Sequence, residues 1–113
     1  MDYYFEKEDL AKFGQGVLRE NAEEMWDKFM EYYGSVFEEG ALTTREKTLV
    51  ALGVALAEQC PYCIDAYTNA CLERGCDQDQ IVEVAHVTSV IKSGATLAFG
   101  VQSKNILEKK SMK

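Results

Sequence analysis

Apolar side chains recur every three or four residues along most of the chain, a spacing typical of amphipathic helices. The clearest stripe lies between an N-cap predicted at Asn21 and a helix end predicted at Gly40. Its apolar members are Met25, Trp26, Phe29, Met30, Tyr33, Val36 and Phe37. A shorter lead-in over residues 5–13 predicts one or two helical turns. No segment alternates apolar and polar residues over five or six positions, so the pattern predicts an all-α protein.

A second helix is expected after the stripe ends. Thr43, with Glu46 three residues later, forms a capping-box pattern that opens a helix running through Ala57. This helix is apolar on nearly every side, which predicts that most of its surface is buried. The residues responsible are Leu49, Val50, Leu52, Val54, Ala55 and Leu56.

The only proline of the chain marks the start of the next helix. Pro61 suits the first helical position because its missing N–H would be unpaired there. This start makes Cys60 the N-cap and Cys63 the third helical residue. The helix is expected to run to about Arg74 and to stop at Gly75.

The last third of the chain keeps helical spacing with one glycine in its middle. Asp77 is the predicted cap of a helix over residues 78–92. Gly94 is expected to interrupt or kink this helix before a final segment over residues 95–107, and the Lys-rich tail is expected to fray. The elements together predict a compact bundle of about five to six helices with a CxxC sequence at a helix N-terminus.

Length and charge narrow the class of protein. The 113 residues fit one domain, residues 1–113, with its core at about 22–107. The net charge of −7 argues against nucleic acid or an anionic membrane as the partner, because both attract a basic face. The N-terminal sequence MDYYFEKEDL lacks the apolar region of a secretory signal, and no apolar run approaches the ~20 residues of a membrane span. Four cysteines without a signal predict a reducing, cytoplasmic compartment.

The strongest chemical signal is Cys60-Pro61-Tyr62-Cys63. Two residues between cysteines at a helix start place both sulfurs within disulfide reach. The helix dipole and the free N–H groups favour a thiolate there. The thiolate is the attacking species in thiol–disulfide exchange and in peroxide reduction, so the motif suits both reactions. Helix position alone favours Cys60 as the attacking sulfur.

The remaining cysteines, Cys71 and Cys76, allow two other interpretations, a zinc site or buried thiols without chemical function. A zinc site would need two further ligands from Cys71, Cys76 and His86, and their spacing matches no common zinc pattern. We therefore expect no metal and no cofactor. Cys71 is interpreted as a buried small hydrophobic residue, and Cys76, in the turn after Gly75, as an incidental or exposed thiol.

These residues carry a family resemblance. The stretch LTTREK at residues 42–47, the apolar helix that follows, and QCPYCIDAY at residues 59–67 resemble the carboxymuconolactone decarboxylase family. Within it, the chain is similar to the branch that includes the alkylhydroperoxidase D-like proteins. The stretch QCPYCIDAYT, with the aromatic-rich N-terminal helix, resembles small peroxidase-like members associated with arsenosugar biosynthesis.

The resemblance implies an all-α fold, an obligate homo-oligomer (a trimer or hexamer), and dithiol-dependent reduction of a peroxide or disulfide. It implies that Cys63 reacts and is oxidised, that Cys60 is the proton donor and disulfide partner, and that a thioredoxin-like or lipoyl-type reductant restores the pair. That branch also uses a relay of one Glu and two His residues. The three matching positions here hold Thr48, Tyr62 and Tyr67.

A replacement for the relay must come from other residues. Glu58 and His86 are the nearest titratable candidates. For Glu58 the alternative is a solvated residue at a helix C-terminus, and for His86 it is a hydrogen-bonded core histidine. Tyr62 and Tyr67 are interpreted either as hydrogen-bond donors near the sulfurs or as aromatic walls of an interface pocket.

Three functions follow from the sequence. The first is a peroxidase-like dithiol oxidoreductase that uses Cys60 and Cys63. The second is a non-peroxidatic enzyme or an arsenical-binding protein of the same fold, with the vicinal thiols as ligands. The third is a structural or interaction protein with packed cysteines. Six Tyr, five Phe and one Trp exceed what one small core needs, and a subunit interface accounts for the excess.

Overall fold

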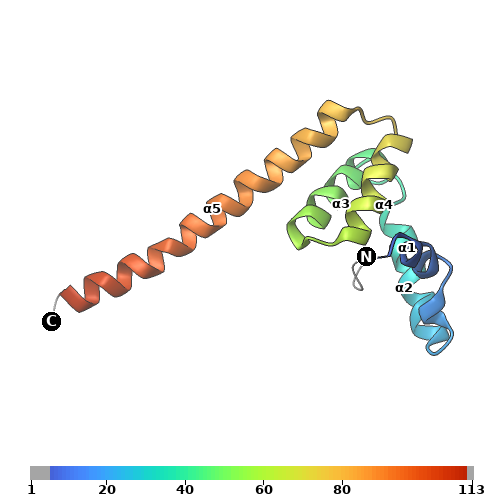
Figure 1. Ribbon diagram of the computed structural model, residues 1–113, viewed down its shortest axis with the longest axis horizontal. Helices are drawn as coiled ribbons and strands as arrows, with labels where there is room; N and C mark the ends of the chain where they lie inside the picture. The colour runs from blue at the N-terminus through green and yellow to red at the C-terminus, as the bar shows by residue number, and fades with distance from the viewer. Residues whose placement is uncertain (1–5, 112–113) are drawn as a thin grey trace.

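The computed structural model describes residues 6–111; residues 1–5, which include the first position of the predicted lead-in helix, and residues 112–113 lie outside the described part. In chain order the elements are α1 (Lys7–Gly14), the 3-10 helix η1 (Val17–Arg19), α2 (Glu23–Val36), α3 (Thr44–Glu58), α4 (Pro61–Glu73) and α5 (Gln78–Ser111). Figure 1 shows α3 and α4 side by side, with α1 and α2 at one end and α5 extending away. The described residues contain no strand, which confirms the all-α prediction.

The best-packed region is formed by α3, α4 and the first turns of α5. Leu52 of α3 is 1% exposed and packs with Cys71 and Cys76, which are 0% and 4% exposed. Partly buried side chains surround these three, namely Leu49, Leu56, Tyr67, Ile81 and Val84. This core cluster joins three helices, and the burial of its apolar side chains stabilises their packing.

Two of the helix caps predicted from sequence, Thr43 and Asp77, are present. The Glu46 N–H donates to Thr43 Oγ1 (3.0 Å), and the Thr43 N–H donates to Glu46 Oε1 (2.8 Å), which is a complete capping box. The same reciprocal pair forms at the start of α5, where the Gln80 N–H donates to Asp77 Oδ1 (2.8 Å) and the Asp77 N–H donates to Gln80 Oε1 (2.9 Å). Local sequence therefore decides where α3 and α5 begin.

The turn after α4 corrects one expectation. Gly75 has a φ of +84°, the left-handed conformation that ends a helix and that glycine adopts without a steric penalty. The Cys76 N–H then donates to the Cys71 carbonyl (2.9 Å), and the Cys76 side chain enters the core cluster. The prediction that Cys76 is exposed is therefore wrong, because this tight turn directs its sulfur inward.

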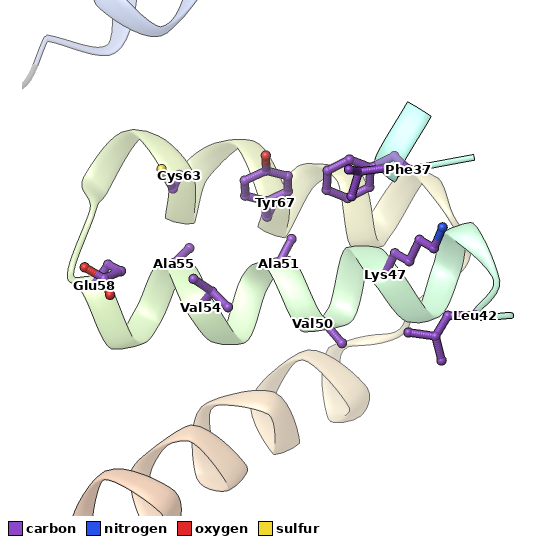
Figure 2. A pocket seen from close by; sticks show the side chains of 11 residues that line it. Phe37, Leu42, Lys47, Val50, Ala51, Val54, Ala55, Glu58, Cys63 and Tyr67 are labelled. Atoms are coloured by element: carbon purple, nitrogen blue, oxygen red, sulfur yellow. The ribbon is translucent and has the colours of Figure 1, made fainter. Parts of the chain in front are cut away.

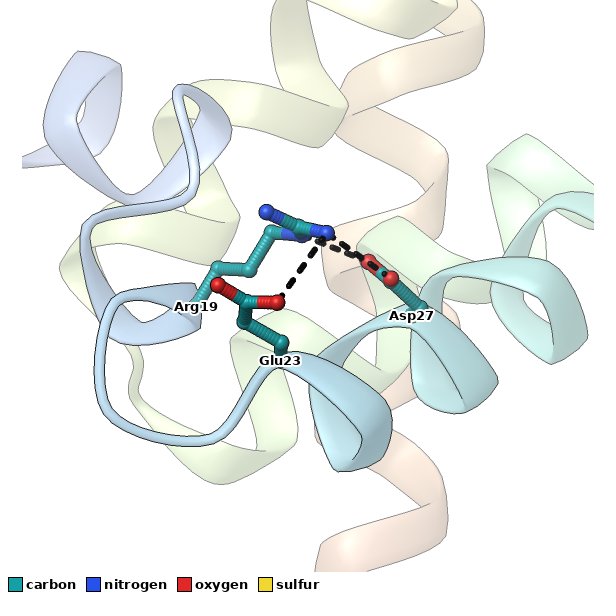
Figure 3. A network of polar contacts seen from close by, with 3 residues as sticks. All are labelled: Arg19, Glu23 and Asp27. Carbon is teal, nitrogen blue, oxygen red and sulfur yellow. Dashed lines mark hydrogen bonds and ion pairs between the residues drawn. The ribbon is translucent and has the colours of Figure 1, made fainter.

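The start of α2 also differs from the prediction. Its N-cap is Ala22 rather than Asn21, and no side chain caps it. Arg19 organises this corner instead, because its Nε and Nη2 donate to the two Asp27 carboxylate oxygens at 2.8 and 3.1 Å (Figure 3). The same Arg19 guanidinium lies 3.9 Å from Glu23 Oε2. The charge-assisted pair with Arg19 holds the pKa of Asp27 below its ordinary value.

The end of α2 comes before the predicted Gly40. The helix ends at Val36, and the Phe37 carbonyl accepts a hydrogen bond from Thr44 Oγ1 (2.7 Å). This bond draws the chain toward the start of α3. Neighbouring aromatic rings along this side, with centroids 5.1–6.5 Å apart, form a continuous row comprising Phe13, Trp26, Phe29, Tyr33, Phe37 and Tyr67.

The last helix is the largest departure from prediction. α5 continues unbroken through Gly94, because a single glycine costs a helix interior only about 1 kcal/mol. Its first part packs on α3, where Lys92 Nζ donates to the Ala57 carbonyl (3.1 Å). Residues 93–111, here called the distal arm, are all exposed and lead away from the other helices (Figure 1).

The distal arm gives the chain an extended shape. The radius of gyration is 19.3 Å, whereas a compact chain of this length has about 13 Å. The expected compact packing is therefore not present, because the unbroken α5 does not turn back on the bundle. By length and composition, α5 is the one described helix that is long and apolar enough to cross a membrane, a test that the core helix of a soluble protein also passes.

Candidate functional site

The two sulfurs of the CxxC sequence lie where the spacing predicts. Cys60 is the N-cap of α4 in extended conformation, and Pro61 is the first helical residue. The Cys63 N–H donates to Cys60 Sγ (3.3 Å), so the N-cap thiol satisfies one of the free N–H groups. The two Sγ atoms are 2.6 Å apart, and both residues are partly buried free thiols. This arrangement lets a disulfide form with little movement of the backbone.

The environment of the second thiol opposes its ionisation. Burial, followed by the neighbouring Cys60 sulfur, raises the pKa of Cys63 to about 11. A backbone hydrogen bond at the helix N-terminus acts in the opposite direction but is outweighed. The thiolate that the helix start was expected to favour is therefore not favoured at Cys63 in a single chain.

A groove of about 650 Å³ runs beside the dithiol, between the end of α2 and the facing sides of α3 and α4 (Figure 2). Four of its residues carry polar groups or sulfur, namely Lys47, Glu58, Cys63 and Tyr67. The rest of the wall is apolar and comprises Val36, Phe37, Leu42, Val50, Ala51, Val54 and Ala55. Cys63 lines the groove and Cys60 does not, so a ligand in the groove meets the second sulfur.

Tyr67 lies one helical turn after Cys63 on α4, and both side chains face the same side of the helix (Figure 2). Its hydroxyl is in close hydrogen-bonding contact with the hydroxyl of Tyr33 from α2. Burial, the Tyr33 hydroxyl and the two sulfurs all raise the pKa of Tyr67. The phenol of Tyr67 therefore stays protonated at neutral pH, so its hydroxyl keeps a proton that it can donate.

The two predicted titratable candidates lie in different places. Glu58 is the last residue of α3, is exposed as its helix-end position predicted, and also lines the groove with Cys63. His86 lies on α5, is exposed, and is not among the residues that line the groove. The expectation of a core histidine is therefore wrong for the single chain. The structure brings together Cys60, Cys63 and Glu58, but not His86.

Two of the three relay positions of the family pattern, Thr48 and Tyr62, make structural contacts here. Thr48 is 2% exposed, and its hydroxyl donates to the Thr44 carbonyl (2.7 Å), so no carboxylate or free donor stands at this position. The Tyr62 hydroxyl donates to Asp9 Oδ2 (3.2 Å), which ties α4 to α1 rather than serving the sulfurs. Only Tyr67 of the three positions faces the groove.

The other two cysteines form a second, buried pair. Burial, followed by the neighbouring Cys76 sulfur, raises the pKa of Cys71 to about 11. Among residues 6–111, no group of three or more His, Cys, Asp or Glu side chains is arranged to hold a metal ion. The zinc alternative thus lacks a ligand set in the described chain, since His86 is on the exposed surface of α5.

Two groove-related residues were not predicted. Tyr33 was interpreted as part of the apolar stripe that packs in the core. The four-residue spacing places it on the same helix face as Phe37, and this was the only sequence signal for its position near α4. Lys47 lines the groove and donates through Nζ to the Glu38 carbonyl (2.6 Å). Nothing in the sequence near Lys47 distinguishes it from an ordinary solvated helix residue.

Comparisons with known proteins agree with this architecture. The model of the carboxymuconolactone decarboxylase family matches residues 23–102. An uncharacterised protein encoded in the cox locus of Paracoccus denitrificans is 33% identical over 82 residues, which cover 73% of this chain and 74% of that protein.

Two solved structures share the fold. A protein from Methanobacterium thermoautotrophicum superposes with a TM-score of 0.72 at 27% identity, over 75% of this chain and 96% of that chain. A carboxymuconolactone decarboxylase family protein from Legionella pneumophila, solved in its apo form, superposes with a TM-score of 0.67 at 21% identity, over 84% and 88% of the two chains.

Proposed function

The chain belongs to the carboxymuconolactone decarboxylase family, and from that premise we propose that it is a thiol-dependent oxidoreductase of the alkylhydroperoxidase D-like branch, similar to the small peroxidase-like members associated with arsenosugar biosynthesis. Its Cys60–Cys63 couple reduces a peroxide or a disulfide. The observation that carries the proposal is the position of two adjacent thiols at the start of α4, with one of them on the wall of an apolar groove.

With a peroxide, the reaction takes two steps. The thiolate of Cys63 attacks one peroxide oxygen, the O–O bond breaks, and an alcohol or water leaves after taking a proton, so that Cys63 becomes a sulfenic acid. The Cys60 thiol then attacks the sulfenic sulfur, water leaves, and a disulfide forms. An external dithiol of the thioredoxin-like or lipoyl type reduces this disulfide by thiol–disulfide exchange and is itself oxidised.

The groove residues supply the protons. The Tyr67 hydroxyl, held by its contact with Tyr33, donates a hydrogen bond to the oxygen that leaves. Glu58, on the same groove, accepts the proton of the attacking thiol through solvent. In this proposal Tyr67 and Glu58 replace the Glu and His relay, and His86 of the same chain takes no part.

The cysteines and the exposed apolar surface also support a proposal for the cellular location and the oligomeric state. We assign the protein to the cytoplasm as a homo-oligomer, a trimer or hexamer, since free thiols need a reducing compartment and the exposed apolar surface needs covering. The net charge of −7 supports a small-molecule substrate and a protein reductant rather than nucleic acid or a membrane.

One observation favours a second candidate function. The placement of two vicinal thiols at one helix start also suits chelation of a trivalent arsenical, because two soft thiolates displace two of its ligands. In that case the groove binds the organic part of the arsenical, and no peroxide is consumed.

Peroxide consumption with a dithiol reductant tests the proposal. We expect activity in the wild type and a loss of at least about 100-fold in Cys60→Ser and in Cys63→Ser, since each lacks a reacting sulfur. Cys71→Ala is the matched control and keeps its activity. If wild type and both serine variants are equally inactive while the wild type binds phenylarsine oxide in a 1:1 complex, arsenical binding replaces peroxide reduction as the function.

A further inference from the structure

The distal arm carries apolar side chains that no other part of the described residues 6–111 covers. Leu97 is 77% exposed and Phe99 is 68% exposed, and further exposed apolar residues follow at Val101, Ile106 and Leu107. These residues point to several sides of the helix, because their spacing does not follow a single 3.6-residue stripe. A helix that is apolar around most of its circumference is stable in water only when other elements pack on it.

The groove beside Cys63 presents a matching uncovered surface. Val50 and Val54 of α3 are 58% and 56% exposed, and Val36 and Leu42 on the same groove are also exposed. The distal arm of the same chain does not reach this groove, because α5 is one continuous helix that leads away from it (Figure 1). Any helix that fills the groove therefore comes from another molecule.

Charge indicates which molecule that is. Residues 93–111 contain three of the 12 basic residues and one of the 19 acidic residues, so the distal arm carries +2, whereas residues 1–92 carry −10. The arm is thus attracted to the body of a second copy of the same chain. The acidic body would be repelled by the anionic bilayer that a basic apolar helix otherwise favours.

We propose that the distal arm of one chain packs into the groove of a second copy, so that each groove is closed by a helix from its neighbour. This inference rests on the proposed function and deepens it, because it names what completes the site over Cys63. The arm of 19 described residues is about 29 Å long at 1.5 Å per residue, long enough to span the α3 side of the groove. A closed groove excludes bulk water from the sulfurs and admits only small substrates.

Cross-linking in a mixed population tests the placement of the arm. Equal amounts of unlabelled and ¹⁵N-labelled full-length chain are refolded together and treated with an amine-reactive cross-linker. Lys47 lines the groove, while Lys104, Lys109 and Lys110 lie on the arm. We expect mixed-isotope peptides that join Lys47 of one chain to an arm lysine of another. Arm lysines that cross-link only within their own chain, or to other chains but never to Lys47, would overturn the proposal.

A matched pair of full-length variants tests the need for the arm. Phe99→Glu places a charge on an exposed apolar position, and we expect light scattering to show a fall to the 12.7 kDa monomer with unchanged helix content. Gln102→Glu adds the same charge at an exposed polar position of the arm and keeps the oligomer. A wild-type monomer, or sedimentation of the wild type with phosphatidylglycerol vesicles in place of self-association, contradicts the proposal.

Activity separates this inference from the proposed function. If the wild type assembles and gives the Lys47 cross-links but consumes no peroxide, the arm placement stands and the peroxidase proposal fails. If monomeric Phe99→Glu consumes peroxide as fast as the wild type, the peroxidase proposal stands and the closing of the site by the arm is wrong. Loss of at least about tenfold in the Phe99→Glu monomer, with normal Gln102→Glu, supports both.

Discussion

Two pairs of cysteines lie at the two ends of α4, and they differ in what surrounds them. Cys60 and Cys63 open the helix, and Cys63 lines the groove. Cys71 and the following Cys76 lie at the other end, sealed in the core cluster with Leu52. In each pair the neighbouring sulfur raises a thiol pKa, so proximity is common to both.

Access to the groove, rather than thiol acidity, is what distinguishes the pair that we propose to react from the pair that packs in the core. Burial raises the pKa of Cys63 and the pKa of Cys71 to about 11 in both cases. Both thiols are therefore weakly ionised at neutral pH. Cys63 has an open groove beside it, while Cys71 is 0% exposed. A pKa alone would assign the two residues the same chemistry.

The largest expected difference between Cys63 and Cys71 is in their rates of alkylation. We expect limiting iodoacetamide to modify Cys63 in the native protein at least about 100-fold faster than Cys71, because Cys71 reacts only when the core opens. The Cys63 rate should rise about tenfold per pH unit below pH 11, since the thiolate fraction does. Peptide mass spectrometry after timed quenching measures each site.

Cys60 is the internal reference for that experiment. Helix position favours Cys60 as the attacking thiol, whereas the family resemblance and the groove favour Cys63. Faster labelling of Cys60 than of Cys63 would transfer the attacking role to the N-cap thiol. Equal labelling of Cys63 and Cys71 would show that the groove does not provide access.

Local sequence signals predicted the geometry of the Cys60–Cys63 pair and the burial of Cys71, but not the burial of Cys76. Pro61 between the cysteines fixes the helix start, so the reach of Cys60 to Cys63 follows from sequence alone. The burial of Cys76 depends on the turn at Gly75 and on Leu52 from another helix, which short-range rules do not contain. His86 shows the same limit, since apolar neighbours in sequence did not place it in a core.

The distal part of α5 exposes a related limit. Gly94 lowers the stability of a helix, but whether the helix breaks there depends on tertiary contacts that favour a bend. The described residues make no such contacts at Gly94, and α5 continues through it. Capping residues such as Thr43 and Asp77 were predictable because their hydrogen bonds lie within four residues. Contacts with other chains are the part that sequence patterns do not specify.

Substitution in the buried pair should reduce stability more than substitution in the CxxC pair, whereas substitution in the CxxC pair should reduce activity more. Cys71→Ser places a hydroxyl in the core cluster, and we expect a loss of about 1–3 kcal/mol in the free energy of unfolding. Cys60→Ser retains an N-cap acceptor at the start of α4, and we expect a change within about 0.5 kcal/mol. Urea unfolding followed by circular dichroism, at one protein concentration, gives both values.

The result decides whether the second pair is structural. Equal stability of the two serine variants would mean that Cys71 contributes no more than Cys60 to the fold. A Cys71→Ser protein that folds but loses peroxide reduction in its folded fraction would contradict the division of roles between the pairs.

Tyr67 lies between the pairs on the same face of α4, and its substitution should have the smallest effect. Tyr67→Phe removes the hydroxyl that contacts Tyr33 but keeps the ring of the core cluster. We expect kcat/KM for peroxide to fall about tenfold, or about 1.4 kcal/mol in transition-state free energy, because the leaving oxygen loses a hydrogen bond. Tyr32→Phe, at an exposed position of α2, is the control and should remain within twofold of wild type.

Alkylation of the same variant separates a donor role from a packing role. Iodide leaves from iodoacetamide without accepting a proton, so Tyr67→Phe should leave the labelling rate of Cys63 unchanged while peroxide reduction slows. A parallel fall in both rates would show that the tyrosine shapes the groove around Cys63 rather than donating to the peroxide. Because Tyr33 reaches the substrate only through Tyr67 in this arrangement, Tyr33→Phe should slow peroxide reduction less than Tyr67→Phe and should also leave alkylation unchanged.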